Sequence, residues 1–223
     1  NYLINNNFIN EEWNALNVLV QNASTVGLLD LKMLSHQEDN NFVFFDKLNS
    51  NKFKFLYLLG SDNLEFKKNN EFIVYQGSHG DRGAELADVI LPSSTYTEQN
   101  GLYSNLEGRV QECKKASYPI GESLEDWKIF NLILKKLGKI DCLNNFETLR
   151  KETVNSIINF SQINNLPKRL INKNDKVNSE FYSEEILIKK LDYYYTNSIS
   201  RSSKTMSECR QINEKIPKTG TNN

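Results

Sequence analysis

Residues 52–63, with the sequence Lys-Phe-Lys-Phe-Leu-Tyr-Leu-Leu-Gly-Ser-Asp-Asn, predict the first strand of a buried sheet. Their apolar end is almost continuous, which is typical of strands covered on both faces of a parallel sheet. Two further apolar runs, at residues 71–76 and 87–91, stop at Gly77 and Pro92 respectively. Short strands separated by loops of this kind predict an α/β fold, with a Rossmann-like parallel sheet and flanking helices.

Three stretches around this sheet have apolar residues at helical spacing. Residues 124–137 predict an amphipathic helix that Ser123 caps and Gly138 terminates. Residues 146–160 predict a second helix, and residues 10–34 predict a third that ends in a short turn.

This pattern divides the chain into three parts. Residues 1–50 form an N-terminal helix and loop that contact a partner, and residues 51–160 form the α/β core. Within the core, the alternation of polar and apolar side chains at 93–112 predicts an extended or hairpin segment. Residues 161–223 are predicted to form an irregular segment and then a tail, since Asn, Lys and Ser dominate residues 161–180. About the last 25 residues are polar and interrupted by Pro217 and Gly220, which predicts that the tail is extended.

The composition argues against several classes of function. The 223 residues carry 27 basic and 28 acidic side chains, a net charge of −1 that does not favour binding to nucleic acid or to an anionic membrane. No apolar run approaches the ~18 residues of a membrane span, and no secretory signal is visible at the N-terminus. The 31 asparagines, with Lys in excess of Arg, reflect A/T-rich codons and indicate an organellar or AT-rich nuclear genome.

The cysteines and histidines are too few and too scattered to form a metal site. The chain has three cysteines, far apart, and two histidines, with no CxxC pair: Cys113, Cys142, Cys209, His36 and His79. Zinc and iron–sulfur sites need several soft ligands at short spacing, so no metal ligand is predicted in this chain. A disulfide scaffold is equally disfavoured, and a reducing compartment is the simplest interpretation.

Two glycine-containing loops follow predicted strands. The loop at residues 77–83 and the loop at residues 60–63 could let backbone N–H groups approach a phosphate. Neither matches the P-loop or the dinucleotide fingerprint, and turns that need a positive φ angle are the favoured interpretation of both. His79 beside Asp81 could act as an oriented general base, but no nucleophile stands at a compatible spacing.

The serines and charged residues after the third strand are weaker candidates. Ser93 and Ser94 lack the glycines of a nucleophile elbow. Four residues of the following segment are predicted to form a partly buried polar network that locks it to the sheet: Glu98, Asn105, Glu107 and Arg109. If the network holds a buried ion pair, its disruption by Arg109→Ala should cost on the order of 3 kcal/mol.

Two longer motifs are distinctive when they are taken together. Residues 76–92 have the sequence Gln-Gly-Ser-His-Gly-Asp-Arg-Gly-Ala-Glu-Leu-Ala-Asp-Val-Ile-Leu-Pro, and residues 101–111 have Gly-Leu-Tyr-Ser-Asn-Leu-Glu-Gly-Arg-Val-Gln. With Glu98 between them, they resemble the signature of the molybdopterin oxidoreductase superfamily. Residues 125–129 extend the likeness to one branch, the C-terminal domain of the large iron–sulfur subunits of mitochondrial NADH:ubiquinone oxidoreductase, respiratory complex I. The resemblance runs from residue 11 to residue 210.

The resemblance implies a structural role. The chain is expected to complete and brace the large iron–sulfur subunit in the peripheral arm of complex I, on the matrix side of the mitochondrial inner membrane. The family's iron–sulfur clusters are bound by a cysteine-rich N-terminal part, so the clusters are expected in a partner chain, and no cofactor is expected in this one. Other peripheral-arm subunits are the remaining expected partners, with no nucleic acid and no direct membrane span. Since the family's second domain is longer than this chain, a split gene is expected.

Two alternatives remain open at this point. The chain could be a fragment of an active molybdopterin-dependent oxidoreductase, with pterin phosphates near Gly60 and Gly77 and a metal ligand from a companion chain. It could also be a free nucleotide-binding domain. No catalytic, cofactor-binding or metal-binding residue is predicted in either case from the residues of this chain alone.

Overall fold

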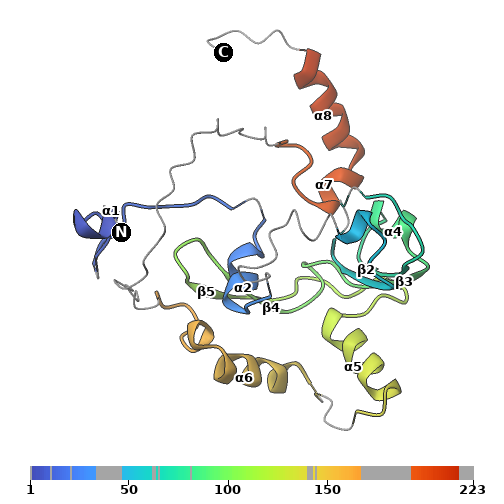
Figure 1. The fold of residues 1–223 in the computed structure, drawn as a ribbon, viewed down its shortest axis with the longest axis horizontal. Helices are drawn as coiled ribbons and strands as arrows, with labels where there is room; N and C mark the ends of the chain where they lie inside the picture. The colour runs from blue at the N-terminus through green and yellow to red at the C-terminus, as the bar shows by residue number, and fades with distance from the viewer. Residues whose placement is uncertain are drawn as a thin grey trace. The chain divides into compact units, whose positions relative to one another are not determined.

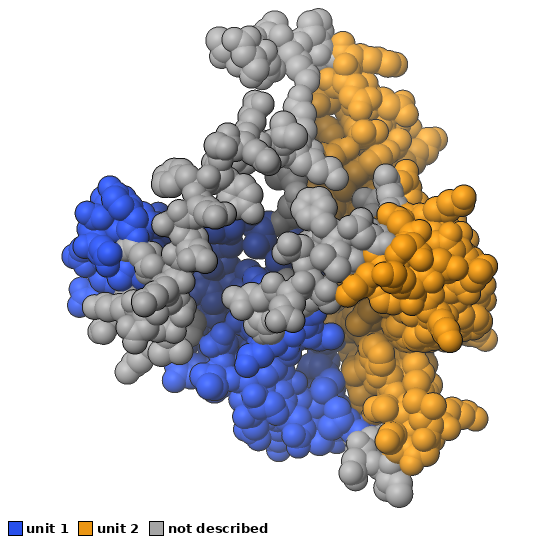
Figure 2. Space-filling view, viewed as in Figure 1, with its two compact units in different colours: residues 1–36, 100–114, 143–188 blue, residues 37–99, 115–142, 189–223 orange. Residues whose placement is uncertain are grey.

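The computed structural model describes most of the chain as two compact units, coloured separately in Figure 2. Unit 1 comprises Asn1–His36, Asn100–Lys114 and Leu143–Ile188, and unit 2 comprises Gln37–Gln99, Lys115–Cys142 and Lys189–Asn223. Each unit is thus built from three separate stretches of sequence. The described residues are 2–10, 12–20, 22–33, 47–61, 64, 66–80, 82–139, 143, 145–166 and 192–215.

A parallel sheet forms the centre of unit 2 (Figure 1). Its strands are β1 (Phe55–Leu59), β2 (Phe72–Gly77) and β3 (Val89–Pro92), in the order β1-β2-β3. Tyr57 lies opposite Val74, and Val74 lies opposite Val89, so side chains of the same face stand in rows across the strands. The predicted α/β fold with a parallel sheet is therefore confirmed.

One face of this sheet carries the buried core. Leu56 and Leu58 of β1 pack with Ile73 and Tyr75 of β2, because alternate residues of each strand point to the same side. Leu48 completes the buried cluster, and the half-buried apolar side chains around it come from the flanking loops and from α4 (Arg82–Leu86): Phe53, Leu64, Phe66, Ala84, Leu86 and Ala87.

The opposite face of the sheet is only partly covered. Helix α5 (Asp126–Lys136) contacts it through Phe130, whose ring stacks on Tyr57 at a centroid distance of 5.6 Å. Phe55 and Phe72 lie on the same face at the other end of the strands, and their rings stack on each other while remaining about half exposed. This end of a parallel sheet is normally covered.

Helix α5 confirms the predicted helix but not its predicted cap. The residue at the N-cap is Glu125, which makes no side-chain capping hydrogen bond, and the Ser123 hydroxyl donates instead to the carbonyl of Ile120 at 2.7 Å. The C-terminal end is as predicted, because Gly138 adopts a φ of +74° and Lys139 N–H donates to the carbonyl of Leu134.

Unit 1 contains an antiparallel hairpin and short helices. Strands β4 (Gly101–Ser104) and β5 (Val110–Cys113) pair in register, which confirms the predicted hairpin segment. Helix α6 (Phe146–Ser156) and the 3-10 turn η1 (Ile158–Phe160) confirm the second predicted helix, with Ile157 breaking it between the two. The remaining elements of the unit are α1 (Tyr2–Asn5) and α2 (Thr25–Asp30).

The long N-terminal helix predicted over residues 10–34 is wrong for the described residues. Only α2 is helical there. The Asn10 side chain accepts hydrogen bonds from Glu12 N–H and Trp13 N–H, and Asn14 accepts one from Leu16 N–H. Such local turns compete with the backbone bonds of a helix, so the apolar spacing was not sufficient to form one.

The extended C-terminal tail is also wrong for the residues that are described. Residues 198–215 form α7 (Ser198–Ser202) and α8 (Lys204–Lys215). Asn197 and Ser200 form a reciprocal capping box at the start of α7, and ion pairs one turn apart support α8, such as Arg210 with Glu214 at 3.4 Å. Pro217 and Gly220, on which the extended tail was predicted, lie outside the described residues.

The three-part division of the chain at residues 50 and 160 stays a prediction. The compact units draw on segments from all three of its parts. None of the helices in the described ranges combines the length and the apolar character needed to cross a bilayer.

Candidate functional site

The candidate site lies at the carboxyl ends of the parallel strands, where open α/β sheets bind their ligands. Gly60 directly follows β1 and has a φ of +59°, so the predicted turn with a positive φ is present at this loop. Gly60 N–H donates to the carbonyl of Gln76 at 2.8 Å, which ties the loop to β2. Asp62 and Asn63, the other polar residues of this loop, lie outside the described residues.

The loop after β2 uses its glycines differently from the predicted turn. Gly77, Gly80 and Gly83 all lack a positive φ, so backbone conformation is not what requires glycine here. A Cβ atom on Gly77 would lie 2.2 Å from the Tyr75 hydroxyl. One on Gly83 would lie 2.6 Å from the Ser61 carbonyl oxygen and 3.1 Å from the Tyr75 ring. Gly77 therefore gives room to the Tyr75 side chain, and Gly83 gives room mainly to the Ser61 backbone.

Tyr75 occupies the space between this loop and the sheet. Its side chain is only 2% exposed, and its hydroxyl donates to the carbonyl oxygen of His79 at 2.8 Å. His79 Nδ1 lies 3.0 Å from the Ser78 hydroxyl. Asp81, the predicted orienting carboxylate for His79, lies outside the described residues.

Ser93 and Ser94 lie at the end of β3 and are both buried. Their backbone N–H groups donate to the carbonyls of Gly77 and Leu124, so they link β3 to β2 and to the segment before α5. The Ser94 hydroxyl is buried without a hydrogen-bond partner in the structure. The backbone hydrogen bonds of the two serines therefore hold the end of β3 to its neighbours.

A buried chain of hydrogen bonds crosses the site and was not predicted from the sequence. The Tyr57 hydroxyl donates to Gln76 Oε1, and Gln76 Nε2 donates to Asp126 Oδ1 at 2.6 Å. Gln99 Nε2 donates to Asp126 Oδ2 at 2.9 Å, and Asp126 N–H donates back to Gln99 Oε1 at 3.2 Å. We call these four residues, Tyr57, Gln76, Gln99 and Asp126, the strand-end cluster.

The strand-end cluster joins two strands, the loop after β3 and the N-terminus of α5. Gln76 has no exposed surface, so its amide needs partners inside the protein. Burial and the nearby Asp126 carboxylate both raise the pKa of Tyr57, which keeps its hydroxyl neutral and able to donate. The available sequence signal was Gln76 itself, because a glutamine inside an apolar strand predicts a buried hydrogen-bonded partner.

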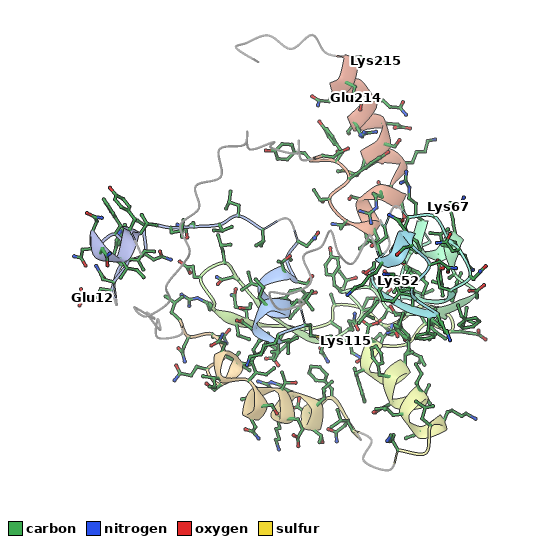
Figure 3. All side chains as sticks on the ribbon, in the orientation of Figure 1. Glu12, Lys52, Lys67, Lys115, Glu214 and Lys215 are labelled. Atoms are coloured by element: carbon green, nitrogen blue, oxygen red, sulfur yellow. The ribbon has the colours of Figure 1, made fainter. Side chains whose placement is uncertain are left out.

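Glu125 is a second buried polar centre beside the cluster. Its carboxylate accepts hydrogen bonds from Trp127 Nε1 at 2.8 Å, from Lys128 Nζ at 3.3 Å and from Lys115 Nζ, labelled in Figure 3, at 3.3 Å. Burial opposes ionisation of this group. The hydrogen bonds from Trp127 and the two lysines outweigh that effect, so the pKa of Glu125 is lower than its ordinary value.

The residues of the predicted polar network have local partners within their own units. Glu98 accepts a hydrogen bond from Thr95 N–H in its own turn. The Arg109 guanidinium donates to the carbonyl of Asn164 at 3.0 Å. Asn105 shapes the hairpin turn, because its Oδ1 accepts from Glu107 N–H and Arg109 N–H. Glu98 belongs to unit 2 and the other three residues to unit 1, so a network that joins all four stays a prediction.

Metal-ligating residues are not gathered in the residues that the structure describes. No group of three or more His, Cys, Asp or Glu side chains with metal-binding geometry occurs there. Cys113 is half-buried and Cys209 is exposed, and both are free thiols. Cys142 and His36 lie outside the described residues.

Comparison with known proteins identifies the family of this fold. The family described as molybdopterin oxidoreductase matches residues 1–136, which include the sheet and the strand-end cluster. The chain belongs to the molybdopterin oxidoreductase family. A second family, which describes the C-terminal region of a subunit of NADH-ubiquinone oxidoreductase, matches residues 165–209.

Curated members of this family are similar over almost the whole chain. The 75 kDa subunit of NADH-ubiquinone oxidoreductase from Reclinomonas americana is 38% identical over 90% of this chain, which covers 29% of that protein. The 78 kDa mitochondrial subunit from Candida albicans is 40% identical over 91% of this chain, and 28% of that protein is covered. A subunit of the NADH-quinone oxidoreductase from Rickettsia typhi is 37% identical over 93% of this chain, with 29% of that protein covered. The chain thus spans less than a third of the length of these relatives.

The family name implies a pterin cofactor, and the geometry at the strand ends allows the fit to be tested. A phosphate at the loop after β2 would need the space between Gly77 and Gly83, which the Tyr75 ring fills. The side-chain amides and the carboxylate nearby already bind one another in the strand-end cluster. The described residues of this loop therefore do not fit a phosphate group of that cofactor.

Proposed function

We propose that this chain is a structural part of the peripheral arm of respiratory complex I, on the matrix side of the mitochondrial inner membrane. It braces the large iron–sulfur subunit that supports electron transfer from NADH to ubiquinone, and it has no redox centre of its own. Its partners are other peripheral-arm subunits and the polypeptide that carries the rest of the large subunit. The iron–sulfur clusters belong to that other part.

The observation that carries this proposal is the similarity to subunits of NADH-ubiquinone and NADH-quinone oxidoreductases over about nine-tenths of the chain. The site geometry is consistent with a scaffold. The buried polar side chains bind one another, and such closed networks fix architecture more readily than they bind a ligand.

The uncovered end of the parallel sheet supports assembly into something larger. Phe55 and Phe72 are 55% and 48% exposed, although they belong to the parallel sheet of unit 2 and their rings stack at 6.3 Å. Parallel sheets are normally covered on both faces, and exposed aromatic pairs mark contact surfaces. In the proposed assembly, this end of the sheet is covered by the rest of the large subunit.

The proposal is tested by locating the chain in solubilised organelle membranes. Mild detergent extraction and a native gel, stained for NADH oxidation and read by mass spectrometry, should place the chain in a very large NADH-oxidising band. The same band should contain the polypeptide that supplies the iron–sulfur clusters. A small band without NADH oxidation would exclude the complex I assignment.

A pair of variants ties that assay to the structure. Phe72→Ser should lower the fraction of the chain in the large band, because it replaces half of the exposed ring pair. Lys67→Ser is the matched control, since Lys67 is an exposed polar residue in the same unit (Figure 3) and the change leaves the ring pair intact. Equal incorporation of the two variants would remove the ring pair from the proposed contact.

A second candidate function is a fragment of an active molybdopterin-dependent oxidoreductase. The family match over residues 1–136 favours it. Under this alternative the purified complex would contain molybdenum or tungsten, and a pterin, in stoichiometric amounts. Elemental analysis and pterin fluorescence of the purified complex therefore distinguish the two candidates.

A further inference from the structure

We propose that Tyr75 is an internal plug that replaces a ligand at the end of β2, and that Gly77 is required by this side chain and not by a phosphate. Gly83 is required by the Ser61 carbonyl together with the Tyr75 ring. The inference deepens the proposed scaffold function and rests on it for its biological meaning. Its physical content concerns only the described residues of unit 2.

The contacts of the Tyr75 ring carry the first step. A Cβ atom on Gly77 would lie 2.2 Å from the Tyr75 hydroxyl oxygen and 2.4 Å from Cζ, distances that real Cβ atoms do not show. Gly77 follows Tyr75 by two residues, so both project toward the same face of β2 and the ring lies along the strand over Gly77. Gly77, which has no side chain, therefore leaves the space that the Tyr75 ring occupies.

The opposite side of the ring is closed by α4. A Cβ atom on Gly83 would lie 2.6 Å from the Ser61 carbonyl oxygen and 3.1 Å from Cδ2 and Cε2 of Tyr75. The ring thus fills the gap between the end of β2 and α4, at the carboxyl edge of the sheet where Gly-rich loops bind phosphates in other α/β folds. The backbone atom that faces Gly83 is a carbonyl oxygen, which repels an anion.

The hydroxyl group fixes the plug in place. It donates to the His79 carbonyl at 2.8 Å, so the loop that would have to open for a ligand is tied to the plug itself. The side chain is also part of the core cluster with Ile73 and Leu58, and a ligand would have to displace a core residue to enter. Both features make the plug a permanent part of the folded unit.

A thermodynamic cycle on the full chain tests the proposal. Gly77→Ala in the wild-type background should lower the melting temperature by about 5 °C, because the added methyl group overpacks against the Tyr75 ring. In a Tyr75→Leu background, which removes Cε1, Cζ and the hydroxyl while keeping an apolar side chain, the same substitution should lower it by less than about 2 °C. Gly80→Ala is the matched control, since a Cβ there meets no atom within 4 Å and should leave the melting temperature unchanged.

The outcomes separate the plug from a ligand-binding loop. The Gly77→Ala single variant could fail to fold while the Tyr75→Leu, Gly77→Ala double variant folds. That result would support the plug as directly as the expected melting temperatures do. Equal losses in the two backgrounds would overturn it. A second measurement needs no variant: titration of the wild-type chain with inorganic pyrophosphate, followed by 31P NMR, should show no saturable binding. Saturable binding that Gly77→Ala abolishes would also overturn the proposal.

These results do not depend on assembly with complex I. A chain that fails to enter the NADH-oxidising band could still show the predicted coupling between Gly77 and Tyr75, and a chain that enters it could lack the coupling. The failure of the plug and the failure of the proposed function are therefore recognised separately.

Discussion

The strand-end cluster and the hairpin turn at Asn105 are both polar, but they are built on opposite principles. In the strand-end cluster, hydrogen bonds join side chains that are 19, 50 and 27 positions apart in the sequence. At the hairpin turn, Asn105 binds backbone groups only two and four positions away. The first arrangement exists only when the fold is complete, whereas the second forms wherever the turn forms. Long-range buried partners should therefore contribute more to stability than the residues of the sequence motif.

The largest expected effect is at Asp126, which holds the two glutamines of the strand-end cluster. Asp126→Ala leaves the buried Gln76 Nε2 group without its acceptor and removes one of the two acceptors of Gln99 Nε2, which also donates to the Ser94 carbonyl at 3.3 Å. The substitution should cost about 3 kcal/mol of unfolding free energy. Asp126→Asn keeps the shape and one acceptor oxygen, and should cost about 1 kcal/mol. Urea unfolding of both variants measures the difference.

A cost of less than about 1 kcal/mol for Asp126→Ala would contradict the larger contribution expected of the strand-end cluster. Such a small cost would mean that the buried Gln76 amide finds water or another partner in the variant. The variant also has a local readout. Trp127 follows Asp126 directly, and its fluorescence reports whether the N-terminus of α5 has shifted.

The next largest effect is the loss of stability at Glu125 in acid. Its pKa in the folded protein is lower than the ordinary value of 4.5, so its hydrogen bonds to Trp127 and the two lysines contribute stability that is present above pH 4.5. That contribution is lost as the pH falls through the lowered folded-state pKa. We expect Glu125→Gln to lower stability at pH 7 by about 1.5 kcal/mol and to show a smaller further loss between pH 5 and pH 3.

Denaturant midpoints at several pH values measure this effect. Asp88 has a lowered pKa through the hydrogen bond that it accepts from Lys68. Burial opposes ionisation of Asp192, but hydrogen bonds from the Tyr194 N–H and from Arg210 outweigh it and lower the pKa of Asp192 as well. The wild type therefore loses stability in acid from several groups. The informative quantity is the difference between the wild-type and Glu125→Gln curves. Parallel curves across the whole pH range would show that Glu125 does not contribute to the loss of stability in acid.

A smaller effect is expected at the hairpin turn. Asn105→Ala removes the acceptor for two backbone N–H groups, but both can turn to water, so the cost should be about 1 kcal/mol. Asn105→Asp keeps the acceptor oxygen and serves as the control. A cost larger than that of Asp126→Ala would reverse the comparison between the two clusters.

The smallest effect is expected at Arg109. The guanidinium makes an exposed hydrogen bond to the carbonyl of Asn164, so Arg109→Ala should cost about 0.5 kcal/mol. The sequence motif alone led to an expectation several times larger. Thermal unfolding in low and high salt checks the assignment, because a neutral acceptor makes the bond only weakly salt-dependent.

The elements that could be predicted from sequence are those whose signal is local. The apolar runs of β1, β2 and β3 gave the parallel sheet, and the spacing of α5 gave its helix and the end at Gly138. The same local reasoning failed at residues 10–34, because asparagine side chains there form turns that compete with a helix. It also failed at α7 and α8, where the capping box of α7 and the ion pairs one turn apart in α8 outweigh a polar composition.

The candidate site was harder to predict than the fold. Gln76 and Gln99 look like ordinary polar residues, and only the folded chain shows that both bind Asp126. The glycines of residues 77–83 were visible in the sequence, but the reason for Gly77 was not. That reason is the direction in which the Tyr75 ring leans, which depends on rotamer and packing.

The close contact between Tyr75 and Gly77 also sets the order in which this protein can change over generations. A lineage that replaced Gly77 first would meet the full steric overlap, whereas one that first exchanged Tyr75 for a smaller residue would leave the glycine free to vary. The glycine would therefore persist by descent long after any ligand had been abandoned. A retained glycine in such a loop is a record of its aromatic neighbour, and not by itself a sign of surviving chemistry.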